Sequence, residues 1–217
     1  MIFRHFLAAA SAGLLAACAA SNPPNYYTLV PGARNPDPAA AARIDAQVID
    51  LRPVIVPAPM DMPQIVARTG QGEVVLLESE RWAGPLADEV RSALAAKLVA
   101  RLGVPVVQDL PADRPGRALL VQVEVQRFDS VLGKQATLDA VWRVRKMAGP
   151  EGDASDSRAN TSLVCRSSYF ATPAGEGVPA LVQAHQRNVA ALGDAITAAA
   201  GAVSAGQPVC PSTTLSE

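Results

Sequence analysis

The side chains that most often carry out catalysis or bind metals are scarce in this sequence. Its 217 residues include two histidines and three cysteines. A Ser-His-Asp triad, a Cys-His pair or a histidine-containing metal site would have to use His5 or His185. His5 belongs to an apolar N-terminal segment, and His185 lies between Val182 and Val189 on the apolar stripe of a predicted helix. This position is typical of a packed histidine, so we predict no catalytic or metal site at His185.

Carboxylate pairs and glycine-rich stretches give no stronger indication of an enzyme. Asp61 with Glu89, or Glu78 with Glu80, could form a pair for acid–base chemistry. Charged residues beside strands are usually solvated instead. Gly70-Gln71-Gly72 falls within a predicted hairpin, whereas a phosphate-binding loop joins a strand to a helix. We therefore predict a protein that is not an enzyme and has no cofactor or metal.

Cys18 stands at the end of an apolar N-terminal segment. The run from Leu7 to Ala17 follows Arg4 and is too short to span a bilayer, which is the layout of a secretory signal peptide. Leu15-Ala16-Ala17-Cys18 resembles a bacterial lipoprotein signal, which implies cleavage after residues 1–17, a diacylglyceryl thioether on the sulfur and an acylated amine. The alternatives are an ordinary cleaved signal with an accidental cysteine, or a buried N-terminal helix.

The predicted anchor also indicates a location. Each buried methylene contributes about 0.8 kcal/mol, so the two or three acyl chains of a lipoprotein, palmitate among them, hold it stably on a membrane. Ala19 and Ala20 follow the cysteine where an Asp would favour inner-membrane retention. We therefore expect a protein that is anchored to the outer membrane, on its periplasmic face.

Composition and charge limit the partners and the domain organisation that the rest of the chain can have. The formal net charge is −1, so no basic field attracts nucleic acid. Residues 18–42 are rich in proline and alanine and read as a lipidated tether, with a possible edge strand at 25–30. Residues 43–217 are enough for a single periplasmic domain.

Cys165 and Cys210 form an even pair in an oxidising compartment, which favours a disulfide. The predicted last helix is about 38 Å long and the strand before it about 33 Å, so the helix would end near the start of that strand. The tail from Val203 to Cys210 can reach about 24 Å, which is enough to return to Cys165. The alternatives are two unpaired cysteines or a nucleophilic Cys165.

Hydrophobic periodicity predicts two helices and seven or eight strands. Apolar residues recur every four positions in the first helix, and a similar stripe extends through the second; alternation, β-branched runs and Gly or Pro boundaries mark the strands. The predicted helices are 86–102 and 178–202, and the strands are 25–30, 44–56, 64–68, 73–78, 104–107, 119–126, 137–147 and 161–170. We predict an α+β fold, a two-layer sandwich of a largely antiparallel or mixed sheet with two amphipathic helices on one face.

Four segments together resemble a known family. They are Asn25-Tyr26-Tyr27-Thr28-Leu29, Val56-Pro57, Pro63-Gln64-Ile65-Val66-Ala67-Arg68 and Arg81-Trp82-Ala83-Gly84-Pro85-Leu86. In this order they are similar to the ABC-type transport auxiliary lipoproteins, the PqiC or YmbA group. Pro59-Met60-Asp61-Met62 departs from the family's more usual Tyr-Leu-Asp-Arg, and Gly84 stands where a Glu is usual.

The resemblance implies a non-enzymatic auxiliary component of an envelope lipid transport system that supports membrane integrity. Its partners would be an MCE-domain protein and inner-membrane transport components, and a homo-oligomer is compatible with the sequence. The residues that it points to for partner binding are on or beside the predicted hairpin: Asp61, Pro63, Gln64, Ile65, Arg68, Arg81 and Trp82. For Ile65 and Trp82 the alternative is core packing, for Pro63 the setting of a sheet edge, and for Arg81 simple solvation.

The competing hypothesis is a lipid-carrying chaperone lipoprotein whose apolar cavity holds the ligand. Such a carrier usually needs a curved sheet or barrel around a pocket. Two helices that cover one face of a modest sheet leave little interior space, so we expect an assembly role instead.

Overall fold

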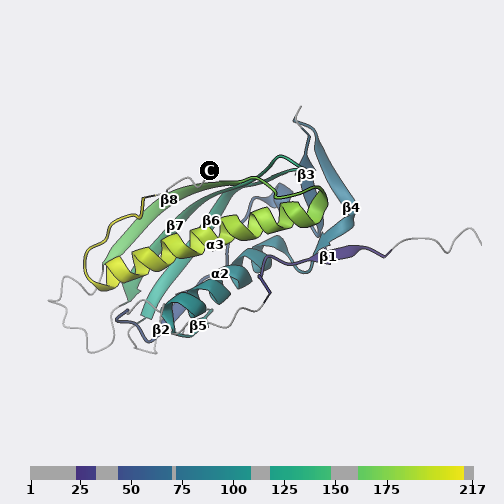
Figure 1. The fold of residues 1–217 in the computed structure, drawn as a ribbon. Helices are drawn as coiled ribbons and strands as arrows, with labels where there is room; N and C mark the ends of the chain where they lie inside the picture. Colours follow the sequence, from purple (N-terminus) through teal and green to yellow (C-terminus); the bar gives the residue numbers. More distant parts are fainter. Residues whose placement is uncertain (1–22, 33–43, 70–71, 109–117, 148–160, 213–217) are drawn as a thin grey trace, which may run out of the picture.

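The computed structural model describes residues 23–32, 44–69, 72–108, 118–147 and 161–212. Two helices lie on one face of a five-stranded sheet, and a three-stranded sheet stands at one end (Figure 1). The predicted α+β class is confirmed, and the strands divide between two mixed sheets. The elements are β1 (Asn25–Tyr27), β2 (Val48–Leu51), η3 (Ala58–Met60), β3 (Gln64–Arg68), β4 (Val74–Trp82), α2 (Leu86–Leu102), β5 (Val106–Val107), β6 (Ala118–Val131), β7 (Gln135–Met147), β8 (Ser162–Ala171) and α3 (Gly177–Ser204).

The large sheet has the strand order β5-β2-β6-β7-β8. Strands β6, β7 and β8 are antiparallel, and β2 runs parallel to both β5 and β6. Val123 of β6, Trp142 of β7 and Cys165 of β8 lie in one cross-strand row and are buried beneath the helices. The alternation predicted for these strands therefore separates a core face from an outer face.

Helix α2 begins and ends where the sequence predicts. Pro85 precedes its first turn, Asp88 and Glu89 lie near its N-terminus, and Gly103 takes a left-handed φ of 68° at the C-cap. The predicted apolar stripe is buried throughout: Leu86, Val90, Leu94, Leu98 and Leu102.

Helix α3 packs against β7, β8 and α2. Gly193 lies where the two helices meet, and a Cβ at this position would be 2.6 Å from Cγ of Lys97. The Asp194 carboxylate beside it accepts from Lys97 Nζ at 2.9 Å and from Arg101 Nε at 3.1 Å. Glycine thus permits the close helix contact that these ion pairs border.

The chain after α3 returns to β8 through a disulfide. Cys165 and Cys210 are bonded, with their Cα atoms 5.8 Å apart. The predicted bridge is therefore present, and it ties the C-terminal tail to the last strand of the large sheet.

The N-terminal strand is fixed to the body of the domain. β1 pairs in parallel with the end of β4, so the predicted edge strand is present but shorter than 25–30. Glu89 Oε2 of α2 accepts hydrogen bonds from Thr28 Oγ1 at 2.7 Å and from the backbone N–H of Leu29 at 2.8 Å. Leu29 is fully buried. Cys18 and the predicted signal peptide lie outside the described residues.

Several predicted boundaries change. β2 occupies only Val48–Leu51 of the predicted strand 44–56, and its pairing with β6 resumes after Pro53 at a single bridge between Ile55 and Glu124. β4 continues to Trp82 and β6 to Val131, beyond the predicted ends at 78 and 126. Among the residues that the structure describes, no helix is long and apolar enough to cross a membrane.

Candidate interaction surface

The β3–β4 hairpin brings most of the predicted partner-binding residues together. The strands are antiparallel, and their register shifts between Gln64 and Ile65, so that Gln64 lies opposite Arg81. The Trp82 backbone N–H donates to the Pro63 carbonyl at 2.9 Å and closes the base of the hairpin. The irregularity lets β4 reach β1 while it remains paired with β3.

A polar rim forms on the outside of this base. Asp61 and Pro63 are exposed. Gln64 Nε2 donates to Glu78 Oε2 at 3.3 Å, and Arg81 Nε donates to the backbone carbonyl oxygen of Glu78 at 3.4 Å. We call Asp61, Pro63, Gln64, Glu78 and Arg81 the hairpin rim. Asp61, Pro63 and Glu78 are exposed and Gln64 and Arg81 are half-buried, so a partner can reach part of this rim.

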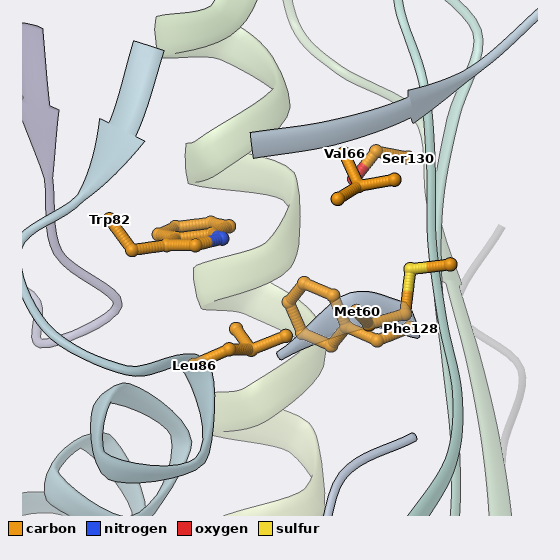
Figure 2. Close-up of a pocket in the computed structure, with 6 residues that line it drawn as sticks. All are labelled: Met60, Val66, Trp82, Leu86, Phe128 and Ser130. Atoms are coloured by element: carbon orange, nitrogen blue, oxygen red, sulfur yellow. The ribbon is translucent and has the colours of Figure 1, made fainter. Parts of the chain in front are cut away.

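Ile65 and Trp82 do not belong to this accessible surface. They are 1% and 4% exposed. The Trp82 indole meets the Phe128 ring edge to face, with centroids 6.1 Å apart (Figure 2). Their side chains therefore stabilise the packing of the hairpin on the body, which favours the core-packing alternative for these two residues.

Arg68 of β3 forms an ion pair that links the two sheets. Its Nε donates to Asp129 Oδ1 at 2.8 Å, and Arg127 Nε donates to Asp129 Oδ2 at 2.6 Å. Burial raises the pKa of Asp129, but the hydrogen bonds from Arg127 and Arg68 outweigh it and hold this pKa below its usual value. Arg68 thus fixes β3 to β6, a role that the sequence alone did not reveal.

His185 of α3 lies in the core behind the hairpin. It is fully buried, and its Nε2 is 2.8 Å from Ser130 Oγ. Burial lowers the pKa of His185 to about 3, against a smaller opposing effect of the Asp129 charge. Among the described residues its Nδ1 has no hydrogen-bond partner. The histidine is therefore neutral and packed, and it is not exposed to a substrate.

Two hollows bear on the lipid-carrier hypothesis. The first lies among Met60, Val66, Trp82, Leu86, Phe128 and Ser130 and has a volume of about 10 Å³, close to one water molecule (Figure 2). The second, about 280 Å³, is an open depression on the outer face of the large sheet, beside Ile55 and Val164. Neither is an enclosed chamber of the size that a lipid needs.

Tyr27 and Glu80 complete the surface where β1 meets β4. Asn25 Nδ2 donates to Glu80 Oε1 at 3.0 Å. Burial, followed by a hydrogen bond to Glu80 and the charge of that carboxylate, raises the pKa of Tyr27 to about 12. The described residues contain no group of three or more His, Cys, Asp or Glu side chains that could hold a metal ion.

The fold and its surface together define a small α+β domain with a docked N-terminal strand and a polar hairpin rim. The chain belongs to the family of the ABC-type transport auxiliary lipoprotein component, whose model matches residues 27–197. No curated protein matches the sequence.

Two crystal structures have a similar fold. An uncharacterized protein has a TM-score of 0.61 and 16% sequence identity, and the similarity covers 82% of this chain and 98% of that chain. A protein from Xanthomonas campestris has a TM-score of 0.52 and 14% identity, over 84% of this chain and 97% of that chain. At these identities the likeness concerns the fold.

Proposed function

We propose that this protein is an outer-membrane lipoprotein on the periplasmic side, acylated at Cys18, that serves as a non-enzymatic auxiliary component of an envelope lipid transport system. The family match over residues 27–197 carries this proposal. Its partners are an MCE-domain protein and inner-membrane transport components, and the function that it supports is membrane integrity.

The geometry supports an assembly role for the domain. The hairpin rim offers Asp61, Gln64 and Arg81 to a partner, while Ile65 and Trp82 hold the hairpin rigidly from behind. A rim of accessible polar side chains on a packed base is suited to recognition without rearrangement. Histidine is a residue type that often acts in catalysis, but His185 is buried and hydrogen-bonded to Ser130.

The lipid-carrier alternative is less well supported. The hollow beneath the hairpin has room for about one water molecule, and the larger depression is open to solvent. A carrier would have to shield acyl chains from water inside the domain.

The test is co-purification from cross-linked native envelopes. The acylated protein should retain an MCE-domain protein, and Cys18→Ser, which removes the acylated sulfur, should leave the domain folded but release it from the membrane fraction. Mass spectrometry should show a lipid-modified Cys18 as the mature N-terminus. Recovery of no envelope transport component, with the protein acylated and abundant, would contradict the proposed function.

A further inference from the structure

Strand β4 has an edge that is only partly used. Along one side it pairs with β3, and along the other β1 pairs only with Glu80–Trp82. β4 is the middle strand of the small sheet, and Figure 1 shows β1 beside its C-terminal end. Within the part of the chain that the structure describes, no strand pairs with the second edge of β4 from Val74 to Ser79.

The direction of the backbone groups along this segment follows from one hydrogen bond. The Thr69 N–H donates to the Glu73 carbonyl at 2.9 Å, so Glu73 faces β3. Residues alternate along an antiparallel ladder as far as Leu77, where the register shifts, so the N–H and C=O groups of Val74 and Leu76 point to the open edge. They form a ready ladder for another strand.

The chain's own N-terminal strand cannot extend along this edge as a regular ladder. The register that pairs Asn25 with Glu80 would place Pro24 opposite Ser79 and Pro23 opposite Glu78. Proline has no backbone N–H and cannot donate to a strand ladder. β1 therefore stops where it does, and the edge beyond it stays open.

The side chains of the open edge suit a particular kind of strand. Val74, Val75 and Leu76 are 44%, 37% and 38% exposed, although all three are apolar. Glu73 and Glu78 are exposed on either side of them. A strand with apolar side chains between two basic residues would bury the apolar groups and pair with both carboxylates.

A second copy of this chain fits the same edge poorly. In an antiparallel pair of two β4 edges, Val74 and Leu76 must meet residues whose N–H and C=O groups also face the edge, as in registers centred on Val75 or Leu76. Glu73 then lies opposite Leu77 or Ser79, and Glu78 opposite Gly72 or Val74, so neither carboxylate meets a cation. A second copy therefore supplies none of the opposite-charge cross-strand pairs that would stabilise a strand at this edge. The charge pattern favours a different protein.

We propose that the β4 edge from Val74 to Ser79 binds an extended strand of a partner protein, one whose apolar side chains are flanked by basic residues. The inference rests on the proposed function, because the partner is the transport component that this lipoprotein assists. Backbone pairing supplies the affinity, and Glu73 and Glu78 select the partner by charge.

The first test uses synthetic peptides and the folded Cys18→Ser protein, so that it does not depend on the transport system. The peptide Lys-Thr-Val-Thr-Val-Lys, with blocked ends, should bind about tenfold more tightly than Glu-Thr-Val-Thr-Val-Glu, because two cross-strand charge pairs change sign. Backbone N-methylation of one alternating set of peptide residues should abolish binding, and methylation of the other set should leave it intact. Equal binding of the methylated forms, or no binding of the basic peptide, would overturn the proposal.

The second test uses two substitutions at one position. Leu76→Ala removes the side chain and keeps the N–H, whereas Leu76→Pro also removes an N–H that the hairpin does not use. Peptide binding should fall severalfold in Leu76→Ala and be lost in Leu76→Pro, with both melting curves cooperative. Equal binding by the two variants would contradict a backbone ladder. If Leu76→Pro does not fold, the methylated peptides decide.

Native envelopes separate this inference from the proposed function. If unsubstituted protein retains the MCE-domain protein and Glu73→Lys/Glu78→Lys retains it equally, the edge proposal fails and the proposed function stands. If the unsubstituted protein retains no transport component while the basic peptide binds, the proposed function fails and the edge remains a strand-binding site. Sedimentation measures whether the protein dimerises. A dimer that is present in the unsubstituted protein and absent in Leu76→Pro would assign the edge to a second copy and overturn the proposal.

Discussion

Phe128 of β6 and His185 of α3 stack with their ring centroids 4.0 Å apart and their planes inclined by 12°. The contact buries the imidazole completely, and the Ser130 hydroxyl is its hydrogen-bond partner. A neutral histidine is thereby built into the junction between the sheet, the helix and the hairpin. It makes the stability of the domain sensitive to pH.

Acid should destabilise the protein through His185. The folded-state pKa of about 3 lies below the unfolded value of 6.5, so below pH 6.5 the unfolded chain binds the proton and the folded chain does not. Between pH 6.5 and pH 5 this group should lower the free energy of unfolding by about 2 kcal/mol. Urea titrations at both pH values measure the loss. His185→Gln should lack this component, and an identical pH dependence in the variant would contradict the assignment.

The bridge between Cys165 and Cys210 should contribute substantially to stability. It spans 45 residues of sequence, for which the loop-entropy model gives roughly 4 kcal/mol. Reduction should lower the melting temperature of the native sequence and leave that of Cys165→Ala/Cys210→Ala unchanged. Denatured, unreduced Cys18→Ser protein should present no reactive thiol, and two labelled thiols would refute the bridge.

Glu89 should hold the N-terminal strand in place. Glu89→Ala leaves the buried N–H of Leu29 without its acceptor, at a cost of about 2 to 3 kcal/mol, whereas Glu89→Gln keeps one acceptor oxygen and should cost less. Hydrogen exchange should accelerate at Leu29 and Val30 in Glu89→Ala more than in α3. Unchanged protection of those two amides would show that β1 pairing suffices.

Arg68 and the hairpin rim should respond differently to substitution. Arg68→Ala removes one of the two cations on Asp129 and should lower the free energy of unfolding by about 1 kcal/mol, a modest value because Arg68 is partly exposed. Gln64→Ala/Arg81→Ala should weaken co-purification of the MCE-domain protein while the melting temperature stays nearly constant. Loss of stability in the double variant, or undiminished binding, would remove the rim from the candidate surface.

The parts of the fold that local chemistry determines could be predicted from the sequence. α2 carries its own start, stop and apolar stripe, between Pro85 and Gly103, and the β3–β4 hairpin carries a Gly-bearing turn. Cys165 and Cys210 could be paired because the lengths of the helix and strand between them fix where the tail returns.

The parts of the fold that depend on contacts between residues far apart in sequence could not be predicted. The charged residues Arg127 and Asp129 favour the end of a strand by composition, yet β6 continues through them. Asp129 is paired with Arg127 and with Arg68, which is far away in sequence. No local sequence pattern indicates the register shift between Gln64 and Ile65, or the division of the strands into two sheets. Trp82 and Ile65 were ambiguous because an apolar side chain beside a hairpin suits a core and a binding surface equally.

The disulfide at β8 also bears on how copies of this protein could associate. β8 is an end strand of the large sheet, and Cys210 rests against it, with its sulfur 3.4 Å from the Val164 carbonyl oxygen. At the opposite end β5 is only two residues long. Filament growth requires two complementary edges on each molecule, one to receive and one to be received. With β8 obstructed and β5 too short, neither end strand of the large sheet offers a long free edge, so a strand bound at β4 would not be propagated through the large sheet.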